Sequence, residues 1–421
     1  MAKLLILADD FTGALDTGVQ FAAKGASTLV VTKPDYDFST MPEQTSVAVF
    51  DTETRHVCPD AAYKTVYSAA LGAKKAGIQH FYKKTDSALR GNIGPELTAL
   101  VDATGAKRLH FVPAFPRMGR VTKRGIHYIN DVPVAESVFG HDPFNPVTCS
   151  DILKMVDEQS SCKVSGISEY VFPPQKDGIF IYDASTDDDL KKIADGLAQR
   201  GELDFLAGCA GFASMLPSLL HLEGSAPLIG KLPPRLLVIC GSVNPITIAQ
   251  LDEAEESGVP RLRLLPEQKL NPSWVSSAEA TDALKSWEKK CRENEICILD
   301  TNNPFSPVGT EKYAASLNLT PEETRAQISH SIGGMVKWIL EQGLESTLLV
   351  TGGDTLLEVM KQIGLEQIVP VGELEPGVVL SYFSFQGKEY PILSKSGGFG
   401  SKTLILDLMK KIRESAAGKD F

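Results

Sequence analysis

The feature that most constrains the fold is the alternation of short apolar runs with amphipathic stretches along the chain. The apolar runs predict strands at 3–8, 28–32, 46–51, 79–84, 109–113, 178–184, 235–241, 296–300 and 347–353. The stretches between them have helical periodicity, which is clearest at 60–76, 187–200, 276–292 and 321–342. Near-continuous apolar strands separated by helices are typical of mainly parallel sheets flanked by helices on both faces. The sequence therefore predicts the α/β class.

The length of the chain predicts two domains, because 421 residues are too many for one hydrophobic core. Segment 221–235, HLEGSAPLIGKLPPR, is rich in Gly and Pro and has no clear periodicity, as expected of a linker. A new strand–turn–helix pattern, RLLVICGSVNPITIAQL, follows it. We expect one domain at 1–228 and a second at 229–421.

Charge and cysteine usage exclude several classes of function. The formal net charge of −11 argues against binding to nucleic acid or to membranes, since both attract a basic surface. The seven cysteines are scattered without C-x-x-C or metal-binding spacing, as expected of buried thiols in a reducing cytosol. We expect no signal peptide, because the first apolar run is short and no basic segment precedes it, and no apolar run has membrane-spanning length. We expect a cytoplasmic protein that binds neither nucleic acid nor membrane.

Two adjacent acids, Asp9 and Asp10, end the first predicted strand. Ligands of open α/β sheets bind at the carboxyl ends of strands, so one acid could face a crevice while the other caps the helix expected at 12–25. A carboxylate in a crevice accepts a proton from a substrate hydroxyl or holds a cation. The alternative is that both acids only cap the helix. Capping needs one acid, so we favour a functional role.

A second polar cluster, YKKTDSALRGNIGPE at 82–96, also follows a predicted strand. Lys and Arg suit a carboxylate, while Asp and Ser suit hydroxyl groups, so the mixture suits a polyhydroxylated anion. A charged surface loop is the alternative. Arg55 follows the third strand at a similar place and is weak evidence alone. The cluster gathers Lys83, Lys84, Asp86, Ser87 and Arg90 within eight positions.

A basic region covers 103–130, where six Lys or Arg residues occur without any Asp or Glu. A nucleic-acid patch is one interpretation, but aromatic and basic residues do not interleave at helical spacing. We favour a mobile loop at 111–130, bounded by Gly and Pro, that covers an anion. Arg120 is the candidate residue within it. The segment 140–146 is a further expected loop that presents Asp142.

Three short turns of Gly or hydroxyl residues mark the second half: CGSVNPIT after 235–240, TGGDT at 351–355 and SKSGGFGSKT at 394–403. Each joins an expected strand to an expected helix, where free backbone N–H groups cradle phosphate. One such turn is weak evidence, but three in one domain are much stronger. Neither a Walker A loop nor a G-x-G-x-x-G fingerprint is present.

Together these segments resemble the four-carbon acid sugar kinase family, the threonate and erythronate kinases. The matching segments, in family order, are ILADDFTGALDTGVQ, DTETR, KKTDSALRGNIGPE, PAFPRMGR, HDPFNP, GSVNPIT, TGGDT and SKSGGFG. The resemblance implies a sugar-acid-binding N-terminal domain, a nucleotide-binding C-terminal domain and an active site in the cleft between them. It also implies transfer of phosphate from ATP to the terminal hydroxyl of a four-carbon sugar acid such as D-threonate or D-erythronate.

The resemblance also implies site residues. The substrate positions would be Asp10, Arg55, Lys84, Thr85, Asp86 and Ser87, to which we add Arg90 and Arg120. The ATP positions would be Ser242, Gly352, Gly353, Asp354, Thr355 and Gly397, to which we add Gly398. In this scheme Arg55 and Lys84 hold the substrate carboxylate, and Asp10 or Asp86 accepts the proton of the attacking hydroxyl. Mg²⁺ bridges the ATP phosphates with help from Asp354, and closure of the domains expels water.

Some alternatives stay open at this point. Asp354 stands where the family often has Glu, and one nucleotide contact expected between Thr301 and Gly343 has no clear residue. Segment 83–96 favours the threonate and erythronate branch over the 3-oxo-tetronate kinases. A dehydrogenase or aldolase, and a non-catalytic sensor of sugar acids or nucleotides, are rivals from other classes. The stereoisomer of the substrate and the oligomeric state, a homo-oligomer included, are also open.

Overall fold

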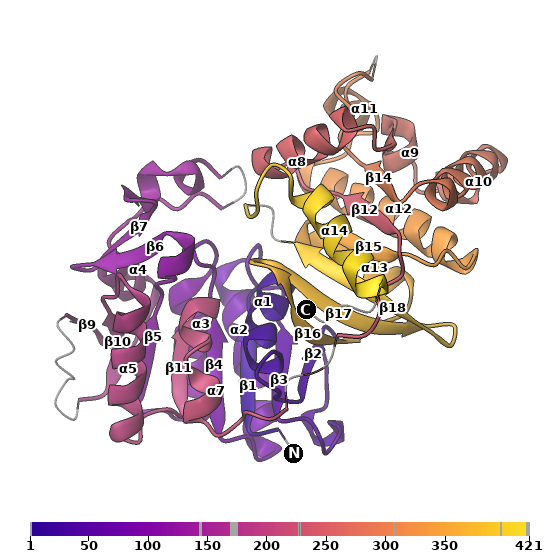
Figure 1. Cartoon of the computed structure of the whole chain (residues 1–421). Helices are drawn as coiled ribbons and strands as arrows, with labels where there is room; N and C mark the ends of the chain where they lie inside the picture. The colour runs from indigo at the N-terminus through magenta and orange to yellow at the C-terminus, as the bar shows by residue number, and fades with distance from the viewer. Residues whose placement is uncertain are drawn as a thin grey trace. The chain divides into compact units, whose positions relative to one another are not determined.

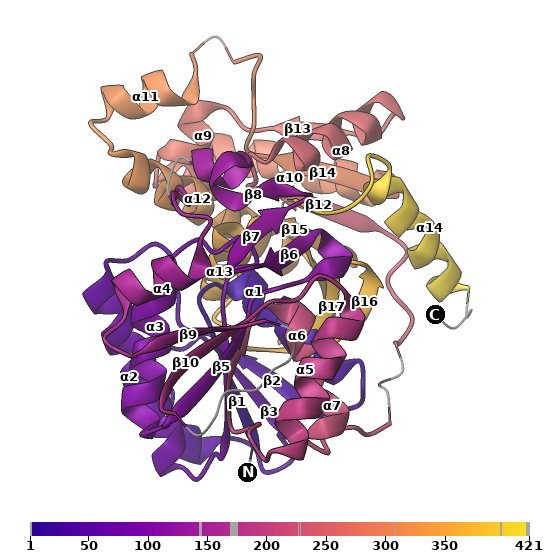
Figure 2. The ribbon, with the colours of Figure 1, turned by 90° about the vertical axis from the view of Figure 1, so that its left-hand side faces the viewer.

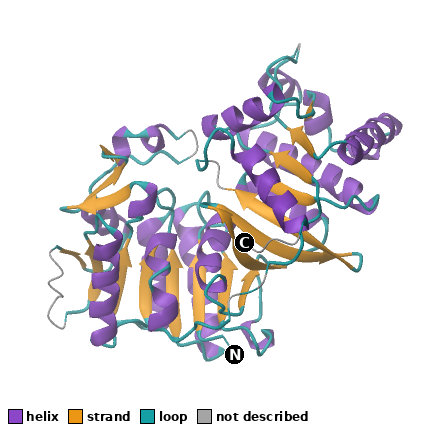
Figure 3. Ribbon diagram, viewed as in Figure 1, coloured by secondary structure: helices purple, strands orange, loops and turns teal. Residues whose placement is uncertain are grey.

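The computed structural model describes residues 2–142, 145–168, 176–225, 227, 229–306, 308–395 and 398–417. The chain divides into two compact units, Met1–Pro227 and Leu228–Phe421, which we call the N-terminal and the C-terminal domain (Figure 1). Each domain combines β-strands with α-helices (Figure 3). The predicted α/β class is therefore confirmed. No helix in the described ranges has the length and apolarity needed to cross a membrane.

The N-terminal domain contains a parallel sheet in the order β2-β3-β1-β4-β11-β5-β10-β9. Its central strands are buried on both faces, as their apolar runs predict. The strands are β1 (Leu4–Ala8), β2 (Thr28–Val31), β3 (Val47–Asp51), β4 (His80–Lys84), β5 (Arg108–Val112), β9 (Val164–Ile167), β10 (Gly178–Tyr182) and β11 (Phe205–Gly208).

Helices cover both faces of this sheet. Figure 2 shows α2, α3 and α4 on one side of the strands and α5, α6 and α7 on the other. The helices are α1 (Phe11–Ala22), α2 (Pro59–Lys75), α3 (Ile93–Thr104), α4 (Ile152–Gln159), α5 (Asp187–Gln199), α6 (Ala210–Ala213) and α7 (Leu216–Leu219). Short 3-10 turns are η1 (Phe38–Thr40), η2 (Pro116–Met118), η3 (Val134–Glu136) and η4 (Val138–His141). The core beneath α2 and α3 is formed by apolar side chains such as Leu5, Phe50, Phe81 and Leu97.

One expectation for this domain is wrong. Segment 111–130 is not one loop, because its second half contributes β6 (Arg120–Lys123) and β7 (Ile126–Ile129) to a small antiparallel sheet that β8 (Val132–Pro133) completes. Arg124 has φ +52° and Gly125 has φ +75°, so these two residues make the tight turn between β6 and β7. The sequence suggested a loop because charged residues interrupt the alternation of apolar side chains that marks a strand.

The C-terminal domain combines a parallel half with an antiparallel half. Strands β13-β14-β12-β15-β18 are parallel, β17 pairs antiparallel with β18, and β16 pairs antiparallel with β17. The strands are β12 (Leu236–Cys240), β13 (Arg261–Arg263), β14 (Ile296–Asp300), β15 (Thr347–Thr351), β16 (Gln367–Glu375), β17 (Val378–Phe385) and β18 (Lys388–Lys395). Apolar runs do not mark the last three, although the third glycine turn implies a strand before it, and β18 is that strand. Strand β16 alternates buried and exposed residues and lacks a continuous apolar run.

Helices also cover the C-terminal sheet, and α8 and α14 pack together over a core that contains Val238, Leu251 and Leu408. Helix α12 packs against α9 and α13. The helices are α8 (Pro245–Glu256), α9 (Pro266–Leu270), α10 (Ala278–Glu293), α11 (Thr310–Ser316), α12 (Pro321–Glu341), α13 (Gly353–Gln362) and α14 (Leu404–Ala416), with η5 at Trp274–Ser276. The four helical stretches predicted at 60–76, 187–200, 276–292 and 321–342 agree with a helix within one or two residues at each end, and the helix expected at 12–25 is α1, which ends three residues earlier.

Candidate active site

Three neighbouring strands bring the predicted substrate residues of the N-terminal domain together. Strand β1 lies between β3 and β4, with Ala8 in register with Asp51 on one side and with Lys84 on the other. The segment after β3 is fixed to β1, because the backbone N–H groups of Thr54 and Arg55 donate to the Asp9 carbonyl at 3.0 and 3.1 Å. The carboxyl ends of these strands therefore present their polar side chains at one edge of the sheet.

Arg55 joins the two acids of the opening motif. Its Nε donates to Asp9 Oδ2 at 2.7 Å, while Nη1 and Nη2 donate to the two carboxylate oxygens of Asp10 at 2.8 and 2.6 Å. The Arg55 side chain is 8% exposed, that of Asp9 is 1% exposed and that of Asp10 is 21% exposed. Burial opposes ionisation of Asp9, but the charges of Arg55 and two lysines outweigh it and lower the pKa of Asp9.

Asp10 combines two roles that the sequence analysis had divided between the acids. Its Oδ1 accepts a hydrogen bond from Gly13 N at 3.0 Å and caps α1, with Glu53 accepting from Phe11 N at 3.2 Å. Asp10 is also the more exposed of the two acids. Asp10 therefore both caps the helix and is the acid with an exposed carboxylate, whereas Asp9 is buried beside Arg55, so the expected division in which the capping acid is not the exposed one is wrong.

Lys84 lies against the first turn of α1. A Cβ atom placed on Gly13 would lie 2.5 Å from Asp10 Oδ1 and 2.6 Å from Lys84 Nζ, so glycine is required for this approach. Lys84 Nζ is also 3.9 Å from Asp9 Oδ1. Lys83 points to the opposite face of β4, where it pairs with the buried Glu96 at 3.0 Å. Lys84 is thus the lysine of this pair that belongs to the site.

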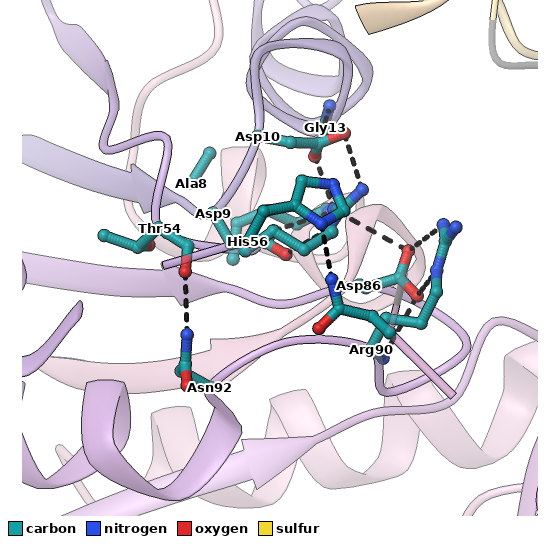
Figure 4. A network of polar contacts seen from close by, with 12 residues as sticks. Ala8, Asp9, Asp10, Gly13, Thr54, His56, Asp86, Arg90 and Asn92 are labelled. Carbon is teal, nitrogen blue, oxygen red and sulfur yellow. Dashed lines mark hydrogen bonds and ion pairs between the residues drawn. The ribbon is translucent and has the colours of Figure 1, made fainter. Parts of the chain in front are cut away.

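Asp86 is held by the turn that follows β4. Arg90 Nε and Nη2 donate to its two carboxylate oxygens at 2.9 and 3.0 Å, and Ala88 N donates at 3.2 Å (Figure 4). Leu89 has φ +63°, a left-handed conformation that lets the chain turn back at this point. Burial opposes ionisation of Asp86, but Arg90 and Arg55 outweigh it and hold its pKa well below the usual value. Asp86 is therefore a weak proton acceptor.

The remaining predicted substrate residues lie around this centre. Arg90 Nη1 donates to Asp142 at 3.3 Å, so the acid expected on a loop is paired. Arg120 is not displayed on a loop. It begins β6, is largely buried, donates from Nη1 to the Met118 carbonyl, and places its guanidinium 6.0 Å from the centre of the Phe139 ring. Thr85 is buried, with its backbone N–H on the Gly208 carbonyl at 2.9 Å.

The sequence analysis missed His127, which holds Ser87 in place. His127 Nε2 lies 2.9 Å from the Ser87 carbonyl and Nδ1 lies 3.0 Å from Thr122 Oγ1. A carbonyl only accepts, so we assign the proton to Nε2 and the Thr122 hydroxyl as donor to Nδ1. Burial lowers the pKa of His127 to about 4, which keeps the ring neutral. His127 belongs to no recognisable motif and lies in the segment expected to be a loop, so the sequence does not predict this contact.

In the C-terminal domain, two of the three predicted turns adjoin each other. The turn after β12 leads into α8, and Asn244 caps that helix by accepting from Ile246 N at 3.0 Å. Gly352, with φ +103°, begins α13. A Cβ on Gly352 would lie 3.4 Å from Ser242 N, and one on Gly241 would lie 1.8 Å from Thr355 Oγ1. Ser242 and the run Gly352, Gly353, Asp354 and Thr355 therefore form one surface.

The third turn follows β18 and leads into α14. Gln250 of α8 binds it by donating to the Phe399 and Ser401 carbonyls at 3.0 and 2.9 Å. A Cβ on Gly398 would meet no atom within 4 Å, so open space lies beside this residue. Gly397, the other predicted position, lies outside the described residues.

The described residues do not form a metal site from protein ligands alone. Among the described residues, no group of three or more His, Cys, Asp or Glu side chains is arranged to hold a metal ion. Asp354, the expected metal-placing residue, pairs with Arg325 at 3.3 Å. Magnesium in nucleotide sites usually needs only one or two carboxylates beside the phosphates, so this arrangement fits an ion carried by ATP.

Comparison with known proteins identifies the family. A model described as the sugar-binding N-terminal domain matches residues 4–216, and a model described as the nucleotide-binding C-terminal domain matches residues 237–405. The chain belongs to the four-carbon acid sugar kinase family. The resemblance drawn from the sequence motifs is therefore confirmed. In this family the network of Asp10, Arg55 and Asp86 lies in the sugar-binding domain, and the three glycine turns lie in the nucleotide-binding domain.

Relatives with assigned activities span the full chain. A D-threonate kinase of Salmonella typhimurium is 30% identical, covering 99% of this chain and 100% of the relative. A D-erythronate kinase of Heliobacterium modesticaldum is 26% identical, covering 95% of each protein. A crystal structure from Salmonella typhimurium LT2 has a TM-score of 0.77 at 22% identity, covering 98% of this chain and 100% of that one, so the fold is shared.

Proposed function

We propose that this chain is an ATP-dependent kinase that phosphorylates the terminal hydroxyl of D-threonate or D-erythronate. The observation that carries the proposal is that the carboxylate of Asp10, the most exposed acid beside Arg55, and the ammonium of Lys84 both lie against Gly13 at the start of α1. A carboxylate and an ammonium at one strand end suit a substrate that has both a hydroxyl to deprotonate and a carboxylate to bind. Membership of a family of sugar-acid kinases supports the same assignment.

Asp10 is the proposed general base. Asp86 is bound by Arg90 through two hydrogen bonds and its pKa is held well below the usual value, which makes proton transfer to it unfavourable. Asp10 is more exposed than Asp9, and Arg55 fixes its orientation through both oxygens. In this proposal Asp10 accepts the proton of the attacking hydroxyl, and Asp86 orients the substrate hydroxyls together with Ser87 and Thr85.

Of the two cations expected to bind the substrate carboxylate, Lys84 is the better placed. Arg55 already donates three hydrogen bonds to Asp9 and Asp10, so its main role is to position Asp10. Arg90 and Arg120 supply further positive charge around the anion. Both guanidinium groups lie near the ring of Phe139, at 5.2 and 6.0 Å from its centre, which limits their movement.

The proposed nucleotide site consists of Ser242, the run from Gly352 to Thr355, and the glycine turn that includes Gly397 and Gly398. The Ser242 hydroxyl and backbone N–H groups at the start of α13 would bind phosphate oxygens. Magnesium carried by the phosphates would neutralise part of their charge, and Asp354 is the residue proposed to assist, by exchanging its partner Arg325 for the ion.

The experiment that tests the function is a coupled assay of ADP release with Mg-ATP and a panel of D-threonate, D-erythronate, their enantiomers and 3-oxo-tetronates. We expect release that depends on D-threonate or D-erythronate. Protein carrying Asp10→Asn, purified in the same way, is the control for contaminating kinases. ADP release only with 3-oxo-tetronates would move the enzyme to that branch of the family. Thermal stabilisation by these acids without turnover would favour a sensor and would refute the proposal.

A further inference from the structure

Lys395 is a buried lysine at the carboxyl end of β18, and no role has been assigned to it so far. Its side chain is among the largest that are completely enclosed, and the residue is 2% exposed. In the sheet Lys395 lies in register with Thr351, the residue immediately before the Gly352 turn. In the chain it lies immediately before the third glycine turn, of which residues 398–401 are described. Lys395 therefore borders two of the three proposed phosphate turns.

Besides its positions beside these two turns, Lys395 also contacts α8. Its Nζ donates to Thr247 Oγ1 at 3.1 Å, and Thr247 is in the first turn of that helix. The Cys240 thiol, at the end of β12, faces the same ammonium. Gln250, one turn further along α8, binds the carbonyls of Phe399 and Ser401. Lys395 is therefore linked to all three turns: to the second by strand pairing, to the third along the chain, and to the helix after the first through its ammonium.

The proposed phosphate turns contain little positive charge of their own. The stretches 241–244, 352–355 and 398–401 contain no Lys or Arg, and their one charged residue is the anionic Asp354; the only lysines of the third turn, 394–403, are Lys395 and Lys402 at its two ends. Nearby cations have carboxylate partners: Arg325 pairs with Asp354, and Lys402 pairs with Glu253 at 2.6 Å. Backbone N–H groups carry only partial charge, whereas the diphosphate and triphosphate of nucleotides carry several negative charges. The turns therefore need a positive charge from outside their own residues.

We propose that Lys395 supplies the fixed positive charge of the nucleotide site, acting from beneath the three turns on the phosphate groups that they bind. This inference rests on the proposed function, because it takes the turns to be the phosphate site. Lys395 is a positioning residue in this account, since its ammonium is enclosed. The ligand class is a nucleoside with at least two phosphates, and the contribution of Lys395 grows with the number of phosphate charges.

The protonation of Lys395 agrees with this role. Burial lowers its pKa to about 8, so most of the ammonium is charged at neutral pH. The facing Cys240 thiol has a pKa that burial raises to about 12, so it remains neutral over the same range. The hydroxyls of Thr247 and Thr351 do not titrate there.

The test is calorimetric titration of adenosine, AMP and ADP into the full chain and into Lys395→Met, which removes the charge and keeps the apolar stem. One charge acting over about 6 Å at an effective dielectric constant near 20 corresponds to about 100-fold in affinity for ADP. We expect a loss of that order for ADP, a smaller loss for AMP and none for adenosine. A loss that is equal for all three ligands would indicate a structural role and would overturn the inference, as would unchanged ADP affinity.

The matched control is Lys269→Met. Lys269 is equally buried and burial lowers its pKa to about 8, but its Nζ donates to the Thr301 carbonyl and it is influenced by the charge of Asp300. We expect Lys269→Met to have the same ratio of ADP affinity to adenosine affinity as the wild type. An equal phosphate-dependent loss in this variant would count against a special position for Lys395.

A second measurement keeps the inference testable if Lys395→Met does not fold. In the wild-type protein the affinity for ADP should fall as the pH rises through about 8, where Lys395 loses its proton, while the affinity for adenosine should not change. ADP affinity that is constant from pH 7 to 9.5 would overturn the inference. If the wild type binds neither ADP nor ATP at any pH, the proposed nucleotide site itself fails, which is a different result.

Discussion

Arg55 binds both carboxylate oxygens of Asp10, with Nη1 at 2.8 Å from Oδ2 and Nη2 at 2.6 Å from Oδ1, although the two residues are 45 positions apart. The same guanidinium binds the buried Asp9 through Nε at 2.7 Å. A planar donor of this kind fixes the angle of the Asp10 carboxylate as well as its position. The orientation of the proposed base therefore depends on one arginine.

Arg55→Lys tests this dependence. Lysine retains the charge but cannot make two parallel hydrogen bonds to Asp10 together with a third to Asp9. We expect kcat to fall by about 10²-fold, because a misplacement of about 1 Å has that effect. Arg55→Met should in addition lower the free energy of unfolding by about 3–5 kcal/mol, since Asp9 would remain buried without its partner. Steady-state kinetics and urea unfolding measure the two effects, and wild-type kinetics in Arg55→Lys would contradict the positioning role.

Asp10→Asn and Asp86→Asn together identify the base. We expect Asp10→Asn to lower kcat by about 10²- to 10⁴-fold, the usual contribution of a general base. Asp86→Asn should mainly raise the KM for the sugar acid, because Arg90 loses its bidentate partner and the turn after β4 loosens. Affinity for ADP should be unchanged in both variants. A larger loss of kcat in Asp86→Asn than in Asp10→Asn would assign the base to Asp86.

Gly13→Ala should severely impair the enzyme, because its Cβ would lie 2.5 Å from Asp10 Oδ1 and 2.6 Å from Lys84 Nζ. We expect loss of turnover with the acid while ADP binding survives. Gly72→Ala in α2 is the matched control, since its Cβ would lie 3.7 Å from Phe38, an ordinary contact. That control should be neutral or more stable by about 0.5–1 kcal/mol, the gain from Gly to Ala within a helix. Full activity in Gly13→Ala would show that Lys84 and Asp10 are not confined as described.

The stability of the protein should fall in mild acid because of buried neutral histidines. Burial lowers the pKa values of His127 and His110 to about 4, against about 6.5 in an unfolded chain. The unfolded state therefore takes up more protons between these values, so stability is complete above pH 6.5 and declines as the pH falls towards 4. Urea unfolding at pH 7 and pH 5 should show a smaller decline for His127→Gln than for the wild type. The exposed His141 provides the control, because His141→Gln should leave the decline unchanged.

Gly241→Ala tests the nucleotide turns independently of Lys395. Its Cβ would lie 1.8 Å from Thr355 Oγ1, so the Ser242 turn and the start of α13 must separate. We expect ADP affinity to fall by about tenfold or more, about 1.4 kcal/mol, with sugar-acid binding retained. Gly334→Ala in α12, whose Cβ would make only ordinary contacts with Val275 at 3.7 Å or more, is the control. Normal ADP binding by Gly241→Ala would place the phosphates elsewhere.

Local sequence pattern predicts some strands of this fold and fails to predict others. The buried run at β1 and the acids after it predict a strand end with polar side chains, because a parallel strand is apolar on both faces and its carboxyl end opens to ligands. Strands β16 to β18 share no single pattern, since β16 alternates buried and exposed residues whereas most of β17 and the second part of β18 are buried. The segment at β6 and β7 was taken as a loop because its charged residues mask the pairing of Arg120 with Ile129.

The sequence by itself determined the α/β class, the family, the set of polar residues at the strand ends and the three glycine turns, since these depend on local pattern and order along the chain. Only the tertiary structure decided how those residues are used. It paired Arg55 with Asp9 and Asp10, bound Asp86 to Arg90, placed His127 beneath Ser87 and enclosed Lys395 among three turns. The physical reason is that ion pairing and burial depend on distances between residues far apart in the chain, which residue type and local spacing do not specify.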